Sequence, residues 1–136
     1  MFEGHKAPIT SLDITTFKHH GDRLVSGSSF GNVKIWDLEK YVQTGSIKIK
    51  TEVLKTHIIQ KQDSLCICGT NGVFLIDGII HNSHNEYRNK LNITSSNMCF
   101  FKEEPNKIVT GCDDNRLVVE DIRLYDDGAN FTSSFR

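Results

Sequence analysis

The sequence repeats one strand–turn–strand pattern three times, and this repeat restricts the possible folds more than any other feature. The clearest copy is Arg23 to Leu38, RLVSGSSFGNVKIWDL, in which two short apolar segments flank a turn rich in Gly, Ser and Asn. Leu65 to Asp77 and Ile108 to Asp121 follow the same order. In the second copy, Asn71-Gly72 predicts a tight hairpin turn, since both residues accept positive φ. Because no useful apolar pattern of helical period occurs, the sequence predicts an all-β chain of repeated units.

The spacing of the copies gives the length of the unit. The glycine after the first apolar segment recurs every 42 residues, and the aspartate after the second recurs after 40 and then 44 residues. These positions are Gly27, Gly69 and Gly111, and Asp37, Asp77 and Asp121. A unit of this length has room for four strands, so we expect three units at about residues 4–48, 49–92 and 93–136.

The first unit also carries residues that mark a known family. Gly4 and His5 precede the first expected strand, and the clearest copy ends in Trp36-Asp37, 31 residues after His5. A Gly-His pair, a small-residue strand and a Trp-Asp ending resemble the WD-repeat β-propeller family. The resemblance implies β-propeller blades of four antiparallel strands, here about three blades. Since closed propellers contain about four to eight blades, we expect an open or incomplete propeller.

The resemblance implies a buried polar network in each blade, formed by a His, a Ser or Thr, a turn Asp and a Trp. The matching residues are His5, Ser26 and Trp36 in the first unit, and Thr110 and Asp114 in the third. Phe30 replaces the turn Asp of the first unit, so His5 loses an acceptor. Glu120 replaces the Trp of the third unit. In the second unit, Cys68 and Ile76 stand at the Ser and Trp positions. The strand-ending aspartates Asp37, Asp77 and Asp121 are expected to cap the following turn.

Composition and motifs indicate a protein without its own active site. The net charge of −1 predicts no nucleic-acid partner, and the absence of a long apolar run predicts no membrane partner. Without a signal-peptide pattern, we expect an intracellular location, in cytoplasm or nucleus, with reduced cysteines. Cys66 and Cys68 would share one strand face but lack a second close cysteine pair, so no metal or other cofactor is expected. No catalytic motif occurs, and we predict that the chain is not an enzyme.

The most consistent function is a non-catalytic protein–protein interaction scaffold, within a multiprotein complex or as a truncated larger propeller. Family members dock partners on the face of tight turns and loops between blades. By position, the candidate contacts are Lys6, Phe30, Asn71 and Asp113. Phe30 either packs on a neighbouring turn or, if exposed, could anchor a partner. We also expect the open blade edges to self-associate or to be completed by another chain.

One alternative is a substrate receptor, or adaptor-binding subunit, of a cullin-type ubiquitin ligase. Some WD-repeat receptors of that kind carry a Trp-Asp-x-Arg ending that docks their adaptor. Asp121 and Arg123 match this ending, whereas Glu120 stands in place of the Trp. The match therefore predicts Arg123 as a candidate partner contact in this alternative.

Overall fold

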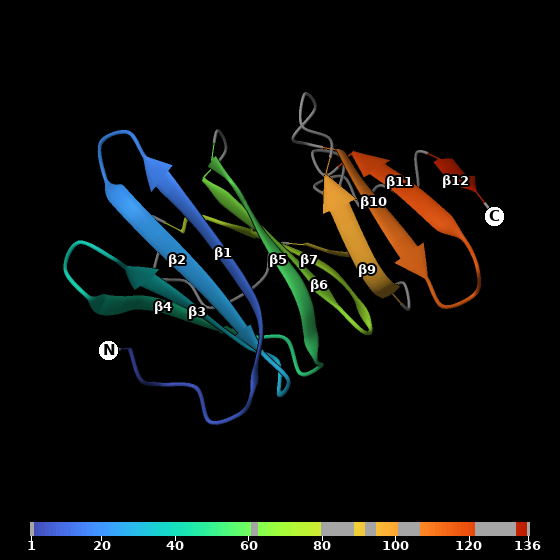
Figure 1. Cartoon of the computed structure of the whole chain (residues 1–136). Coiled ribbons are helices and arrows are strands. Elements are labelled where there is room, and N and C mark those ends of the chain that lie inside the picture. Colours follow the sequence, from blue (N-terminus) through green and yellow to red (C-terminus); the bar gives the residue numbers. More distant parts are fainter. Residues whose placement is uncertain are drawn as a thin grey trace.

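The computed structural model describes residues 2–60, 63–79, 89–91, 95–100, 107–121 and 133–135. Three sheets of four antiparallel strands make up the fold, and in each sheet the strands pair in chain order (Figure 1). The first sheet consists of β1 (Ile9–Phe17), β2 (Gly21–Ser28), β3 (Asn32–Asp37) and β4 (Val42–Lys48). The second consists of β5 (Val53–Ile59), β6 (Ser64–Gly69), β7 (Gly72–Asp77) and β8 (Asn89–Leu91). The third consists of β9 (Ser95–Phe100), β10 (Lys107–Cys112), β11 (Leu117–Asp121) and β12 (Ser133–Phe135).

The sheets stand side by side as blades, with β5 between β1 and β9 (Figure 1). The first and third blades lie at opposite ends of the row, so the array is not closed into a ring. The predicted all-β fold, an incomplete propeller with blades of four antiparallel strands, is confirmed. The boundaries of the units within the sequence stay predictions.

Two hydrophobic cores hold the row together, one on each side of the second blade. Strand β6 shows the arrangement most clearly, because all of its residues are buried. Leu65 and Ile67 join the core shared with the first blade, and Cys66 and Cys68 join the core shared with the third. Since successive side chains of a strand point to opposite faces, one strand contributes to both cores.

Polar contacts reinforce the junction between the first two blades. The Asp13 Oδ2 atom accepts a hydrogen bond of 2.6 Å from the backbone N–H of Ile58. The Thr10 hydroxyl donates to the backbone carbonyl of Val53, and the Gln60 side chain donates to a carbonyl of β1. These bonds join β1 to β5 and the segment that follows it, so they fix the two inner strands relative to each other.

A register shift at the start of the inner strand gives all three blades a common reference point. It lies between Ile9 and Ser11 in β1, and the same shift recurs in β5 and β9. Opposite the shift, on the second strand of each blade, Ser28, Gly69 and Cys112 occupy equivalent positions. The residues just before them are therefore also equivalent, and these are Gly27, Cys68 and Gly111. The alignment of Gly69 with Gly27 is therefore wrong by one residue.

The misleading glycines have separate local causes. A Cβ atom on Gly27 would lie 2.4 Å from a Val53 methyl group, so this glycine allows the first two blades to approach each other. Gly69 instead pairs with Gly72 at the end of the β6–β7 hairpin, which leaves Thr70 and Asn71 as its loop. Neither Asn71 nor Gly72 has a positive φ, so the predicted positive-φ turn at this pair is wrong.

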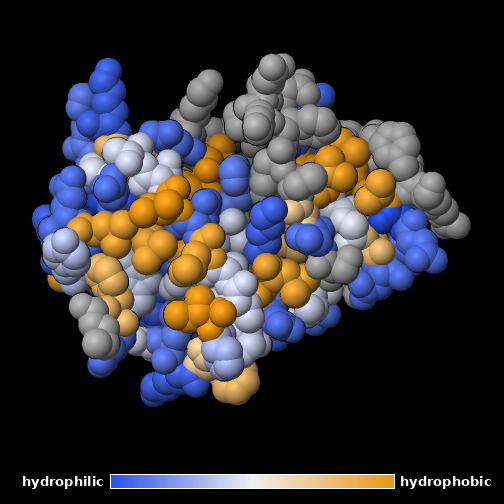
Figure 2. Space-filling view, in the orientation of Figure 1, coloured by the Kyte–Doolittle hydropathy of each residue, from blue (hydrophilic) through white to orange (hydrophobic). Residues whose placement is uncertain are grey.

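The first blade leaves an apolar face uncovered at the end of the row. Figure 2 shows hydrophobic side chains gathered over β1 and β2. Ile9, Leu12 and Ile14 of β1 are all exposed there. The face away from the second blade thus carries the kind of side chains that elsewhere in the chain form a core.

Candidate interaction site

Three side chains on the first blade form a linked polar network. Ser26 is buried on β2, and its Oγ atom accepts a hydrogen bond of 2.9 Å from the Trp36 Nε1–H group. The same Oγ atom lies 2.6 Å from His5 Nε2, with which it shares a second hydrogen bond. The structure thus brings together three of the four network positions identified in the sequence.

The network lacks its fourth member, the turn Asp, and this absence leaves one nitrogen of His5 without a hydrogen-bond partner among the described residues. His5 Nδ1 is buried and has no hydrogen-bond partner among the residues that the structure describes. Burial, together with the charge of Lys34, lowers the pKa of His5, so the imidazole favours its neutral form. Phe30, at the expected Asp position in the β2–β3 turn, is 68% exposed and offers no acceptor.

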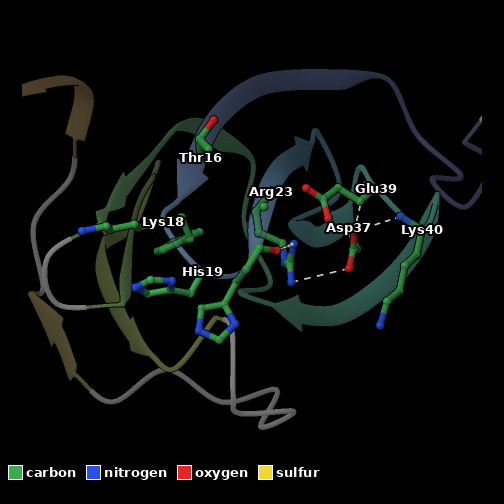
Figure 3. Close-up of a pocket in the computed structure, with 10 residues that line it drawn as sticks. Thr16, Lys18, His19, Arg23, Asp37, Glu39 and Lys40 are labelled. Atoms are coloured by element: carbon green, nitrogen blue, oxygen red, sulfur yellow. Dashed lines mark hydrogen bonds and ion pairs between the residues drawn. The ribbon is translucent and has the colours of Figure 1, made fainter.

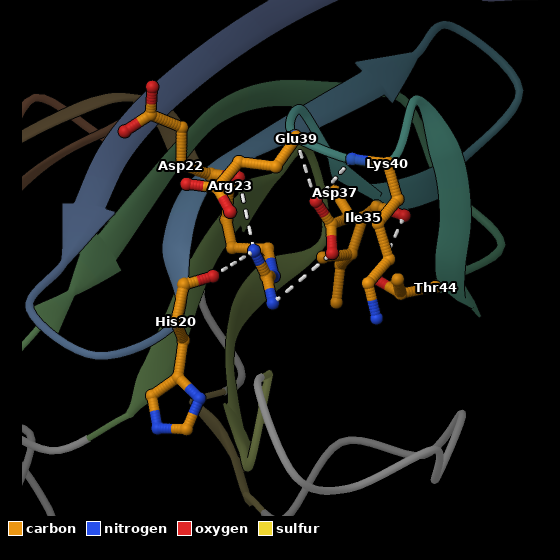
Figure 4. Close-up of polar contacts among 8 residues, drawn as sticks. All are labelled: His20, Asp22, Arg23, Ile35, Asp37, Glu39, Lys40 and Thr44. Atoms are coloured by element: carbon orange, nitrogen blue, oxygen red, sulfur yellow. Dashed lines mark hydrogen bonds and ion pairs between the residues drawn. The ribbon is translucent and has the colours of Figure 1, made fainter.

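Asp37 is the last residue of β3 and lies at the end of this strand away from the β2–β3 turn. Its Oδ1 atom accepts hydrogen bonds from the backbone N–H groups of Glu39, at 2.8 Å, and Lys40, at 3.0 Å (Figure 4). The hydrogen bond from Lys40, together with that from Glu39 and the nearby Arg23, lowers the pKa of the Asp37 carboxyl group. Asp37 therefore caps the turn after its strand.

Arg23 is the buried cation beside this cap. Its guanidinium lies 3.5 Å from Asp37 Oδ2 and donates a hydrogen bond of 2.7 Å to the backbone carbonyl of His20 (Figure 4). Both side chains of the pair are at least nine-tenths buried, so each charge depends on the other for compensation. The pair fastens β2 to the end of β3.

A hollow of about 570 Å³ opens above the Arg23–Asp37 pair. Figure 3 shows Lys18 and His19 on one side of the pair and Glu39 and Lys40 on the other. Both signs of charge line the hollow, and its buried ion pair is already matched. Within the described ranges, no group of three His, Cys, Asp or Glu side chains is arranged to hold a metal ion.

Comparison with known proteins identifies the first blade. Residues 1–37 match the family model described as "WD domain, G-beta repeat". This match covers β1 to β3 of the first blade, so that part of the chain resembles a WD repeat. Proteins with WD repeats generally mediate protein–protein interactions and are generally non-catalytic. A search of curated proteins finds no match.

Similarity to a solved structure extends over the whole row of blades. The crystal structure of the computationally designed Ika8 protein is similar to 97% of this chain, with a TM-score of 0.72 and 21% sequence identity. At this identity the likeness concerns the fold alone. The chain spans only 37% of the length of that designed protein. Among the described residues, no helix is long and apolar enough to cross a membrane.

The second blade replaces the WD network with apolar packing. Ile67 pairs with β5 and β7 as Ser26 pairs with β1 and β3, so Ile67 stands at the Ser position. The assignment of Cys68 to that position is corrected, since Cys68 faces the third blade. Ile76 stands at the Trp position, as the sequence predicts. Ile67 and Ile76 lie together in the core between the first two blades, where they replace the Ser–Trp hydrogen bond by apolar packing. The register shift, which cannot be read from glycine spacing, reveals this assignment.

The third blade keeps only part of the WD pattern. Thr110 and Glu120 are fully buried, and the Thr110 hydroxyl has no hydrogen-bond partner in the described part of the chain. Asp114 is exposed and forms an ion pair of 2.6 Å with Arg116, so it acts within its own turn. Asp121 ends β11 opposite Lys107. Asp77 ends β7 opposite Ser64, and its side chain lies outside the described atoms.

The candidate partner contacts lie along one edge of the row. The β2–β3, β6–β7 and β10–β11 turns lie along the lower edge in Figure 1, and the N-terminal segment lies at the first-blade end of this edge. Lys6, Phe30, Asn71 and Asp113 are all exposed in these segments. Arg123 lies outside the described residues. The edge therefore presents an exposed aromatic ring among polar side chains.

Proposed function

We propose that the chain is a non-catalytic scaffold that binds a protein partner along its turn edge. The observation that carries this proposal is the exposure of Phe30. Its ring stands at a turn position where the WD pattern has a polar residue, yet 68% of its surface is exposed. Large aromatic side chains are enriched among the anchors of protein interfaces. An exposed ring at this edge is therefore better explained by a partner than by packing within the chain.

The neighbouring polar residues support the same function. Lys6 precedes β1 of the first blade and Asp113 lies in the β10–β11 turn of the third; both are exposed, and they carry opposite charges. An apolar anchor with charged residues further out follows the usual anatomy of an interface, in which a polar rim surrounds a buried centre. The partner would place an apolar pocket over Phe30.

The test compares the proteins captured by the chain and by two variants, with mass spectrometry as the readout. Phe30→Ala should lose the partner, since removal of an anchor typically weakens binding about 30-fold or more. Tyr41→Ala removes a similarly exposed ring from the β3–β4 turn and should retain it. Capture of the same proteins by all three chains would contradict the proposal.

The ubiquitin-ligase alternative stays a prediction from Asp121 and Arg123. Its test is direct, because Arg123→Ala should weaken binding of the adaptor subunit in a pull-down. Equal binding by the variant would exclude this docking mode. An intracellular location, in cytoplasm or nucleus, likewise stays a prediction from the sequence. We further propose that the open ends of the blade row associate with another copy or another chain.

A further inference from the structure

The uncovered face of the first blade is equivalent by register to the face with which the second blade contacts the first. By register, β1 residues on this face have counterparts on β5 that pack against the first blade. The pairs are Ile9 with Val53, Leu12 with Thr56, and Ile14 with Ile58. The β1 members are 55% to 65% exposed, whereas the β5 members are at most 6% exposed. In the described structure the first blade covers β5, whereas no described blade covers this face of β1.

The face of the third blade that points away from the second blade is equivalent to the face with which the first blade contacts the second. In the first blade, the residues that cover the second are valines and an isoleucine of β2 and β3, all at most 4% exposed. Their counterparts in the third blade are Val109 for Val25, Leu117 for Val33 and Val119 for Ile35. Leu117 is 49% exposed and lines an open hollow of about 220 Å³ with Val109. The third blade thus has an apolar face with no described blade against it.

The two faces are therefore matching surfaces at opposite ends of one chain. The face of the third blade corresponds to the surface that the first blade offers to the second. The face of the first blade corresponds to the surface that the second blade offers in return. A contact between them would use the same strand positions as the existing junction of the first and second blades, with Ser26 and Lys34 standing where the second blade has Ile67 and Phe74. The net charge of −1 per chain adds little repulsion between two copies.

We propose that two copies of this chain join head to tail at both ends and close a six-bladed propeller. A head-to-tail contact either closes into a ring or continues as a filament. Propellers close with about four to eight blades, and six is the only multiple of three in that range. In such a ring both described end faces of each copy are covered, with Leu12 of each copy against the face of Leu117 in the other. This inference specifies the open-end association proposed above and does not depend on the Phe30 edge.

The first test is the molar mass of the purified chain by light scattering, across a dilution series. The wild-type chain should have twice the 15.4 kDa mass of one copy. Leu12→Asp and Leu117→Asp should each weaken dimerisation about 30-fold or more, because each places a charge in an apolar contact. Val42→Asp is the control, since Val42 is similarly exposed on the outermost strand β4 and should leave the dimer intact.

Mixing the two variants tests the head-to-tail geometry. A pair of one Leu12→Asp copy and one Leu117→Asp copy has both substitutions in one junction and leaves the other junction wild-type. The mixture should therefore regain a dimer that neither variant forms alone at the same concentration. Recovery of the dimer also shows that both variants are folded.

Three outcomes would overturn the proposal. A folded wild-type monomer would mean that other blades or another protein cover the faces. A mass that grows with concentration beyond two copies would mean a filament. A dimer broken by Leu12→Asp but unaffected by Leu117→Asp would mean that two first blades meet each other. Loss of partner capture on Phe30→Ala is measured separately, so failure of the scaffold proposal does not affect this result.

Discussion

Restoring the missing acceptor of the polar network should stabilise the first blade. The hydrogen-bond assignment that satisfies most groups has Ser26 Oγ accepting from Trp36 and donating to His5 Nε2. This leaves the His5 Nδ1–H group as a buried donor without an acceptor in the described residues. Phe30→Asp places a carboxylate at the position where the WD pattern has its turn Asp. We therefore expect the introduced carboxylate to accept a hydrogen bond from Nδ1–H.

The size of the effect follows from the cost of an unsatisfied buried group. Such a group costs about 1 to 3 kcal/mol, and a hydrogen bond to a charged acceptor contributes a similar amount. Because His5 is only half-buried, we expect a gain of about 1 to 2 kcal/mol in the free energy of unfolding. For a chain of this size the gain corresponds to a rise of roughly 3 to 8 °C in Tm. Phe30→Ala should leave Tm nearly unchanged, since the ring is exposed.

Thermal unfolding followed by circular dichroism provides the measurement, and a double-mutant comparison provides the control. In a His5→Ala background, Phe30→Asp should give no gain, because the donor is gone. The reasoning would be refuted if Phe30→Asp failed to raise Tm, or if it raised Tm equally with and without His5. The second result would mean that Asp improves the turn itself.

Three further changes test the remaining polar and thiol groups. Burial lowers the pKa of His5 and of His57 below the ordinary value near 6.5, so the unfolded chain binds more protons. The free energy of unfolding from urea titrations should therefore fall from pH 7.5 to 5.5, and a rise would contradict this sign. Asp37→Ala leaves buried Arg23 without its charge partner and should lower the free energy of unfolding in chemical denaturation. Asp37→Asn, which keeps a capping oxygen, should cost less; equal losses would refute the role of the cap. Burial also raises the pKa of the Cys66 thiol, so iodoacetamide should label Cys66 much more slowly in native than in denatured protein, as peptide mass spectrometry would show.

The blade architecture was predictable because it is encoded locally. Alternating apolar segments and turn residues repeat along the chain every 40 to 44 residues, and the resemblance to the WD-repeat family implies four strands in each unit. His5, Ser26 and Trp36 were also accessible, because their residue types and spacing match a family motif. Phe30 could be assigned to the turn by the same spacing. Its exposure could not be assigned, because an apolar residue at a turn can either pack or face solvent.

The register of the second blade required the structure. Glycine spacing placed Cys68 at the Ser position, whereas the shift at the start of β5 places Ile67 there. Gly27 and Gly69 are small for different reasons, a close approach of two blades and the end of a hairpin, so they are not equivalent markers. The exposure of Leu12 was equally inaccessible, since it depends on whether another blade precedes β1 and not on local sequence.

The double-faced burial of the second blade has a consequence for how the chain unfolds. Both faces of β6 lie in hydrophobic cores, one shared with each neighbour. If either neighbouring blade detached, two β6 side chains would be transferred to water, Leu65 and Ile67 on one face or Cys66 and Cys68 on the other. In repeat proteins, stability is approximately the sum of intrinsic and nearest-neighbour terms. Here the contacts of the second blade with both neighbours involve the same strand, β6. The three blades should therefore lose their structure in one cooperative transition.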